Sequence, residues 1–212
     1  MIAVDAARRH YVDTDSAHGF DHVLRVWRLA ERIGRAEGAD LEILRAAALL
    51  HDVARPEEAR TGVDHAQASA RRAEEILSGA PAEQVARVAQ AIGEHRFRGA
   101  VRPTTIEGRA LFDADKLDAI GAIGVARAYA VAGARRQRVW ADVDAAYAER
   151  APVLGRDDLA SDEHTPVHEY LFKLVRLRDL MQTDTGQRMA DHRHRVMVAF
   201  FEELDREVRG AR

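Results

Sequence analysis

Apolar residues recur at steps of three and four positions along almost the whole chain, and this spacing most constrains the fold. The clearest example runs from Phe20 to Ile33. Gly38 follows it and is suited to end a helix. Residues spaced in this way lie on one face of an α-helix. No stretch of the sequence shows the sustained alternation of a half-buried β-strand. The sequence therefore predicts an all-α protein.

The same spacing predicts six helices after this first one. They cover Leu41 to Val53, Ala66 to Leu77, Pro81 towards His95, Ile106 to about Gly133, Val167 to Met181 and Thr185 to Val208. Gly121 and Gly124 form a weak point that would divide the helix over 106–133 in two.

Two segments between these helices are expected to be irregular. Arg98 to Thr105 contains glycine and proline and is predicted to be a loop. From Trp140 to Thr165 the periodicity weakens, and we interpret this stretch as a flap of the kind that often covers a functional site. We expect one compact helical bundle over residues 1–212. Its core would span about 18–135, and the flap and the C-terminal helices about 140–210.

Composition narrows the environment and the partners. The chain of 212 residues has no cysteine, which excludes disulfides, zinc–thiolate sites and thiol nucleophiles and fits a reducing cytoplasm. No signal peptide is visible, and apolar runs such as Ala46 to Leu50 fall far short of the ~20 residues that span a bilayer. A formal charge of −3 offers no overall electrostatic footprint for nucleic acid. We therefore expect a cytoplasmic protein with a small-molecule partner and no nucleic-acid or membrane partner.

The most apolar predicted helix ends in LLHDVA, where His51 and Asp52 stand side by side. Burying two such groups is costly unless each has a partner. His22 also interrupts an apolar stripe, and Asp115 lies in the apolar stretch LFDADKLDAIGAIG. Each alone has an ordinary explanation, as a hydrogen-bonded core histidine or a capping aspartate. Together they favour a catalytic metal site, because imidazole and carboxylate donors suit Mn, Fe, Ni, Zn or Mg and leave coordination positions open.

These residues carry a family resemblance. The series His22, His51-Asp52 and Asp115 resembles the signature of the HD superfamily of metal-dependent phosphohydrolases, an all-helical fold. The sequence around these residues is similar to sequences of the YedJ/YpgQ-like bacterial branch of this superfamily, and the similarity extends from about His18 to the C-terminal region. The stretches that carry it are HGFDHVLRVWRLA, ALLHDV, AIGEHRF, DADKLDAIGAIGVARAYA and FKLVRLRDLMQTDTGQRMADHR.

The resemblance implies a ligand set. Carried over residue by residue, the ligands of one divalent cation fall on His22, His51, Asp52 and Asp115. The cation would be Mn, Mg, Ni, Fe or Zn, with Mn or Mg favoured. His18 lies four residues before His22, and we assign it to the support of His22 or to the start of the helix.

Four more residues are expected near this site. His65 and His95 would contact the substrate or its leaving group, hold a second metal or be structural, and the sequence leaves these alternatives open. Lys116 is expected to bind phosphate, because a lysine supplies a compact point charge on a flexible stem. Asp118 would either orient a ligand histidine or pair with a basic residue.

Some charged residues close to the pattern keep an ordinary interpretation. Glu57 and Glu58 would act on water in some HD enzymes, but here we interpret them as supplying negative charge to a helix start. Arg98 is interpreted as a surface residue, with contact to a phosphate as the alternative. Glu94 flanks the same loop as Arg98. Histidines outside the pattern are interpreted as surface or boundary residues, and these are His10, His164, His168, His192 and His194.

The resemblance also implies a reaction. Metal-activated water would hydrolyse a (deoxy)nucleoside triphosphate to a nucleoside monophosphate and pyrophosphate, with catalytic roles for Asp52, His95 and Lys116. Lys116 and His95 would stabilise charge on the phosphoryl oxygens or the leaving group. Trp140 and Tyr147 in the flap would contact the base or sugar. A nucleoside monophosphatase, a phosphodiesterase or a non-catalytic metal- or nucleotide-binding sensor remain alternatives, and a homodimer is left open.

Overall fold

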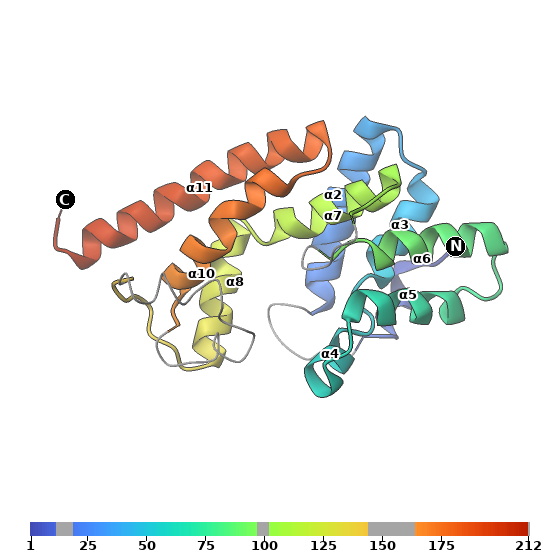
Figure 1. The fold of residues 1–212 in the computed structure, drawn as a ribbon, viewed down its shortest axis with the longest axis horizontal. Coiled ribbons are helices and arrows are strands. Elements are labelled where there is room, and N and C mark those ends of the chain that lie inside the picture. The colour runs from blue at the N-terminus through green and yellow to red at the C-terminus, as the bar shows by residue number, and fades with distance from the viewer. Residues whose placement is uncertain (12–18, 97–101, 144–163, 212) are drawn as a thin grey trace. The chain divides into compact units, whose positions relative to one another are not determined.

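The computed structural model describes residues 1–11, 19–96, 102–143 and 164–211. These residues form helices and turns without a strand, which confirms the all-α class (Figure 1). Their contacts divide the chain into two compact units. Unit 1 comprises Met1–Asp118 with Met181–Gln187, and unit 2 comprises Ala119–Leu180 with Arg188–Arg212. The single domain expected over residues 1–212 stays a prediction.

Unit 1 contains the helices from the first half of the chain. They are α1 (Val4–Arg8), α2 (Phe20–Glu37), α3 (Leu41–Leu50), α4 (Arg55–Thr61), α5 (His65–Ile76), α6 (Ala82–Gly93) and α7 (Ile106–Asp118). Periodicity predicted α2, α3, α5, α6 and α7, but it missed α1 and α4. These two helices have five and seven residues, too few to repeat an apolar stripe.

Local chemistry sets the bounds of the helices that carry the site. Helix α2 ends because Gly38 adopts a left-handed conformation with φ of 76°. Helices α3 and α5 each begin after an aspartate, Asp40 and Asp64, whose side chain accepts two backbone N–H groups of the first turn. Such caps satisfy N–H groups that have no partner inside the helix.

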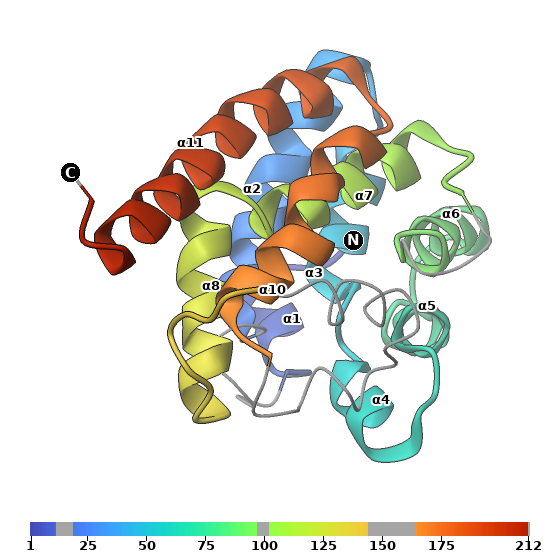
Figure 2. The ribbon, with the colours of Figure 1, turned by 60° about the vertical axis from the view of Figure 1, so that its left-hand side comes forward.

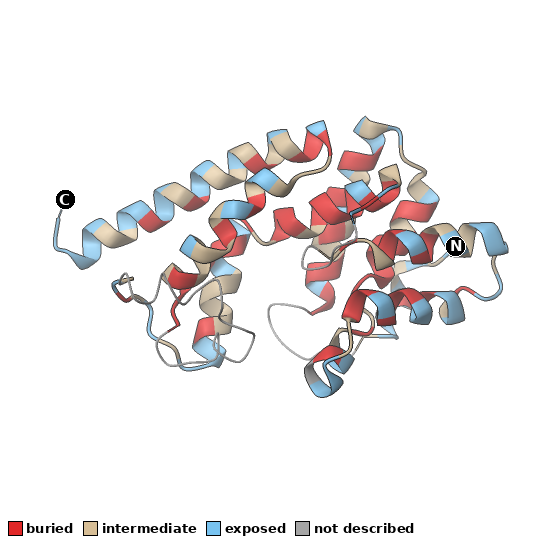
Figure 3. Cartoon of the chain, viewed as in Figure 1, coloured by how far each residue is buried: buried red, intermediate tan, exposed pale blue. Residues whose placement is uncertain are grey.

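Helix α3 lies in the core of unit 1 and packs against α2, α6 and α7. Figure 2 shows α5 and α6 side by side, and Figure 3 shows buried residues along much of α7. Every side chain from Ala46 to Leu50 is buried. The residue that follows α3 is His51, so the chain enters the site directly from its most apolar helix.

A buried carboxylate ties the segment Met181–Gln187 to α7. Asp113 accepts hydrogen bonds from the backbone N–H groups of Gln182 and Thr183, at 2.8 and 2.9 Å, and from the Thr183 hydroxyl at 2.6 Å. Burial raises the pKa of Asp113 above its usual value. This contact joins residues about seventy positions apart, which periodicity cannot reveal.

Unit 2 contains α8 (Gly121–Ala134), α10 (Pro166–Phe172), a 3₁₀ helix over Leu174–Leu180 and most of α11 (Asp184–Val208). The break between α7 and α8 confirms the weak point predicted at the glycines, and Gly121 has a φ of 76°. The helix predicted over 167–181 is interrupted at Lys173 and continues as the 3₁₀ helix.

Two histidines of unit 2 correct an expectation. His164 and His168, interpreted from sequence as surface or boundary residues, are both buried. Thr165 and His168 form a capping box at the start of α10, with the Thr165 backbone N–H donating to His168 Nδ1 at 3.2 Å. The histidine is therefore buried because it completes a helix start.

Several sequence expectations fall on residues outside the described part of the chain. They concern His18, Arg98, Tyr147 and most of the flap predicted over 140–165. Among the described residues, no single helix has both the length and the apolar composition of a membrane span. Helices α7 and α8 meet both criteria only when they are taken together across their break.

Two glycines of α8 provide a matched test of packing. A Cβ added at Gly124 would lie 2.2 Å from the backbone oxygen of Ala119, whereas one added at Gly133 would meet nothing within 4 Å. We expect Gly124→Ala to lower the free energy of unfolding of unit 2 by about 1–3 kcal/mol, because backbone must move. Gly133→Ala should instead raise it by up to about 1 kcal/mol through helix propensity. Equal effects of the two substitutions in urea denaturation would contradict this packing.

Candidate metal centre

The four residues predicted as metal ligands lie together in unit 1. His22 comes from α2, His51 and Asp52 from the turn after α3, and Asp115 from α7. His22 Nε2 lies 3.8 Å from Asp52 Oδ2 and 3.6 Å from Asp115 Oδ1, and His51 Nε2 lies 3.8 Å from Asp52 Oδ2. His22, His51 and Asp52 are buried, whereas the Asp115 side chain is 21% exposed. Asp115 is thus the one of these four residues whose side chain reaches solvent.

Two further histidines meet the other oxygen of Asp52. Nε2 of His65, the first residue of α5, lies 3.5 Å from Asp52 Oδ1, and Nε2 of His95, just after α6, lies 4.0 Å from it. Both histidines are buried. Asp52 therefore has His22 and His51 on one oxygen and His65 and His95 on the other. Each half, with Asp52, has donor atoms close enough together to hold a cation.

In His51 and His95, the hydrogen bond at Nδ1 determines which ring nitrogen offers a lone pair. His51 Nδ1 bonds to the backbone oxygen of Ala48 at 2.8 Å, and His95 Nδ1 to that of Ile92 at 2.6 Å. A carbonyl oxygen only accepts, so each Nδ1 carries the proton and each neutral ring presents an unprotonated Nε2.

His51 Nε2 is the strongest indication that the cluster fits a cation. It is buried and has no hydrogen-bond partner among the described residues. An unpaired buried lone pair close to a buried carboxylate is unfavourable, and a divalent cation is the partner that satisfies both. The donor set of imidazole nitrogen and carboxylate oxygen matches this chemistry.

The charges around the cluster keep its carboxylates ionised. Burial raises the pKa of Asp52, but Arg55 and the surrounding histidines outweigh that effect and hold it well below the usual range. The pKa of Asp115 is also held low, because Lys116 and the nearby histidines outweigh its burial. Burial, with His51 and Lys116 as neighbours, lowers the pKa of His95 to about 3.

Two cationic side chains border the donor cluster. Lys116 Nζ donates to Asp115 Oδ2 at 2.7 Å and to the backbone oxygen of His95 at 3.0 Å. Arg55 Nη1 lies 3.4 Å from both oxygens of Asp52, and its side chain is 32% exposed. Sequence reasoning predicted Lys116 near the site but missed Arg55. Its position three residues after Asp52 was the available signal.

The acidic residues flanking the pattern have separate roles. Glu58 lies in the first turn of α4 as expected, yet its carboxylate is buried and accepts from His65 Nδ1 at 2.8 Å. It also pairs with Arg96 at 2.9 Å. Glu94 accepts from the backbone N–H of Thr104 at 2.8 Å and so anchors the residues before α7. Glu58 therefore belongs to the surroundings of the site, and Glu94 to the scaffold.

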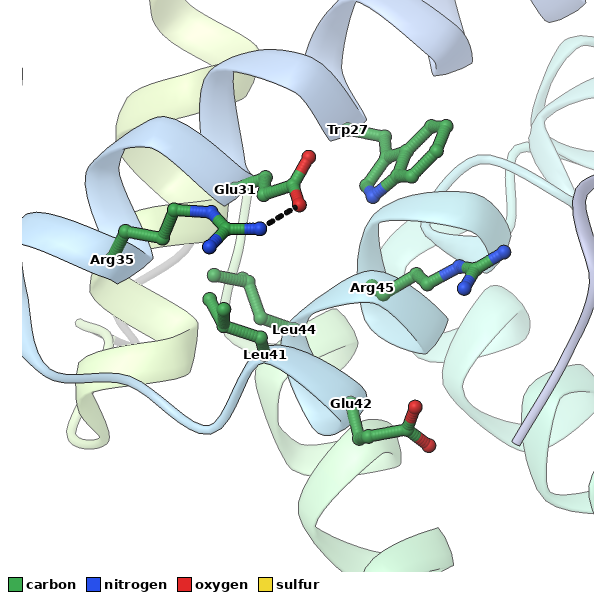
Figure 4. A pocket seen from close by; sticks show the side chains of 7 residues that line it. All are labelled: Trp27, Glu31, Arg35, Leu41, Glu42, Leu44 and Arg45. Atoms are coloured by element: carbon green, nitrogen blue, oxygen red, sulfur yellow. Dashed lines mark hydrogen bonds and ion pairs between the residues drawn. The ribbon is translucent and has the colours of Figure 1, made fainter.

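A separate pocket of about 190 Å³ lies between α2 and α3 (Figure 4). The Arg45 guanidinium lies over the Trp27 ring at 5.2 Å, and Arg35 donates to Glu31 across one turn. None of the clustered histidines or aspartates lines this pocket. We assign this pocket no role.

The fold and the buried His/Asp cluster define an all-α protein with a candidate metal-binding centre. Comparisons with known proteins place this protein in a family. The HD domain model matches residues 19–120. YpgQ from Bacillus subtilis (strain 168) is 36% identical over 205 residues, which cover 93% of this chain and 88% of the relative. The chain therefore belongs to the HD-domain family.

Solved structures agree with this assignment. The crystal structure of B. subtilis YpgQ in complex with ADP has a TM-score of 0.72 and 32% identity and covers 97% of this chain and 98% of its own. A protein described as a predicted HD superfamily hydrolase, from an uncultured Thermotogales bacterium, gives a TM-score of 0.65 and 30% identity, with 96% of this chain and 90% of its own covered. A Lactobacillus plantarum protein gives 0.75 and 29%, with 99% and 100% covered.

The cluster predicts a thermal response to cations. Mn²⁺ at a hundredfold excess over its dissociation constant should raise the Tm of the metal-free protein by roughly 5–10 °C, because it binds only the folded state. Asp52→Asn should abolish this shift, since Asp52 lies at the centre of the donors. Differential scanning fluorimetry with and without MnCl₂ measures both. An equal shift in the variant would contradict binding at the cluster.

Proposed function

We propose that the chain is a metal-dependent (deoxy)nucleoside triphosphate pyrophosphohydrolase that releases a nucleoside monophosphate and pyrophosphate. The observation that carries the proposal is the buried Nε2 of His51, which has no hydrogen-bond partner within the described residues and lies 3.8 Å from the ionised carboxylate of Asp52. Membership of the HD family supports hydrolysis, and the ADP complex of YpgQ supports a nucleotide ligand.

In this proposal His22, His51, Asp52 and Asp115 hold one divalent cation, with Mn or Mg favoured. They offer two nitrogen and two oxygen donors from α2, the turn after α3 and α7. A cation held there supplies a bound water of lowered pKa and polarises a phosphoryl oxygen. Asp52 keeps the site anionic, because its carboxylate stays ionised despite burial.

His65 and His95 then face the substrate side of Asp52. In a neutral His95 ring, Nδ1 donates to the Ile92 oxygen, so Nε2 accepts a hydrogen bond and orients water or a protonated substrate group. This differs from the sequence expectation that His95 stabilises developing negative charge, because an unprotonated Nε2 cannot donate. The alternative assignment places a second cation on Asp52, His65 and His95, so that each chain would bind two ions.

Lys116 and Arg55 are the proposed phosphate ligands. Both cations lie beside the carboxylates of the cluster, Lys116 on Asp115 and Arg55 on Asp52. With a bound cation sharing the charge of those carboxylates, Lys116 and Arg55 would be available to pair with phosphoryl oxygens. Arg55 suits a bidentate contact because of its planar fork, and Lys116 supplies a point charge.

The reaction products test the proposed activity. With Mn²⁺ and a panel of ribo- and deoxyribonucleoside triphosphates, ion-exchange chromatography should show equal amounts of monophosphate and pyrophosphate. Release of inorganic phosphate from a monophosphate would identify a monophosphatase, and cleavage of a cyclic or dinucleotide diester a phosphodiesterase. Tight binding of metal and nucleotide without turnover would identify a sensor. Each of these results would overturn the proposal.

Substitution of Lys116 separates phosphate contact from metal binding. Lys116→Ala should lower kcat/KM about 100-fold, because a positioned charge on the phosphoryl group is lost. Its Mn²⁺ affinity should stay close to that of the unsubstituted protein. Arg72→Ala removes an exposed cation of α5 that pairs with Glu75, and it serves as the control with unchanged kinetics. Steady-state kinetics measure kcat/KM, and isothermal titration calorimetry measures the Mn²⁺ affinity. A kcat/KM that did not fall in Lys116→Ala would contradict the proposed role of Lys116.

A further inference from the structure

A buried carboxylate stands directly behind His22, on the side away from the metal centre. Asp118, the last residue of α7, is 1% exposed, and its Oδ2 lies 2.7 Å from His22 Nδ1. The opposite ring nitrogen, Nε2, faces Asp115 and Asp52. Asp118 and the donor cluster therefore contact opposite edges of the same imidazole ring.

Arg25 holds both oxygens of Asp118. Its Nε donates to Oδ1 at 2.7 Å and its Nη2 to Oδ2 at 3.1 Å, a two-point contact between a planar guanidinium and a carboxylate. Arg25 lies one turn after Asp21 on α2 and also donates to that residue. The order Asp21, Arg25, Asp118, His22 thus runs from an exposed side chain to the metal centre.

This arrangement differs from the one at His51. The Nδ1 of His51 bonds to a backbone oxygen, and a carbonyl oxygen forces that nitrogen to carry the proton. The Nδ1 of His22 meets a side chain, and the partner's chemistry decides the tautomer. An ionised Asp118 accepts, so it selects the Nδ1-protonated ring and leaves the lone pair of Nε2 directed at the cluster.

We infer that Asp118, held by Arg25, is a positioning residue that fixes the Nδ1-protonated tautomer of His22 and thereby strengthens binding of a divalent cation. The statement about the cation rests on the proposed function. The statement about the tautomer concerns the metal-free protein and can be tested by itself.

The substitution Asp118→Asn tests whether Asp118 selects the tautomer of His22. Arg25 donates to both oxygens of Asp118, and the bond from its Nε to Oδ1, at 2.7 Å, is shorter than the bond from its Nη2 to Oδ2, at 3.1 Å. We therefore expect the amide oxygen of the introduced asparagine to keep the Oδ1 position on Nε, which places its NH₂ group at the Oδ2 position facing His22 Nδ1. His22 Nδ1 must then accept a hydrogen bond, and the ring proton moves to Nε2. Nε2 therefore no longer offers a lone pair to the cluster. Asp118→Asn therefore keeps the shape of the residue but reverses the tautomer.

Asp113→Asn is the matched control. Asp113 is a second fully buried carboxylate on α7, but it accepts from Thr183 and Gln182 instead of from a clustered histidine. Its loss should lower stability without changing metal affinity. Arg25→Lys provides a graded variant, because a lysine keeps the charge but cannot make the two-point contact.

The experiment combines two measurements on the same proteins. Long-range ¹H–¹⁵N correlation spectra of the metal-free protein at pH 8, with His22 assigned through His22→Gln, report which nitrogen carries the proton. Titration with Mn²⁺ monitored by electron paramagnetic resonance reports affinity. We expect Nδ1–H in the unsubstituted protein, Nε2–H in Asp118→Asn, and Mn²⁺ binding about 10–100-fold weaker in that variant, intermediate in Arg25→Lys and unchanged in Asp113→Asn.

The outcomes separate this inference from the proposed function. Nε2–H in the unsubstituted protein, or equal Mn²⁺ affinity in a folded Asp118→Asn, would overturn the inference and leave the proposed activity standing. Failure of the unsubstituted protein to bind Mn²⁺ would overturn the proposed function, whereas the spectra would still decide the tautomer. If Asp118→Asn did not fold, the spectrum of the unsubstituted protein and the graded loss in Arg25→Lys would carry the test.

Discussion

The buried carboxylate of Asp52 is the constraint on which the rest of unit 1 depends. It is 3% exposed, and four imidazole Nε2 atoms lie within 4.0 Å of its two oxygens. An ionised carboxylate in such a position is unstable unless positive charge compensates it. Arg55 supplies part of that charge from the solvent side. Among the described residues the buried His51 Nε2 has no hydrogen-bond partner, and this unpaired lone pair favours a cation at the centre.

The helices serve this carboxylate in two ways. Helix α3 is buried almost throughout, and its apolar side chains hold the turn with His51 and Asp52 in the interior. Helices α2 and α7 pack against each other and bring His22 to Asp115. Ring orientation is then set by hydrogen bonds behind the histidines, to backbone oxygens for two of them and to carboxylates for the others. Packing positions the donors, and these bonds aim them.

Much of the fold was predictable, because helical periodicity depends on neighbours three and four positions away. The bounds of α2 and α11 and the break before Gly121 follow from such local signals. The interruption at Lys173 does not, since the apolar pattern continues through it. In the site, the four expected donors do meet. Their meeting was anticipated from polar residues that interrupt apolar stretches and from the family resemblance. Periodicity did not predict it, because periodicity carries no information on how distant helices pair.

The surroundings of the donors were the least predictable part. Sequence left Asp118 with two possible roles, and it combines both, since it binds a histidine and an arginine. Neither Glu58 nor Arg55 was assigned to the site from sequence, because the burial of Glu58 and the orientation of Arg55 depend on contacts with α5 and with the turn after α3. Long-range ion pairs leave no periodic trace in a sequence. A charged residue becomes recognisable as part of a site only after its partner is located.

Anomalous diffraction from crystals soaked in MnCl₂ tests the central claim most directly, because it locates the cation among the donors without relying on turnover. The account predicts one manganese peak per chain, bounded by His22, His51, Asp52 and Asp115. Absence of a peak, or a single peak bounded by Asp52, His65 and His95, would contradict it.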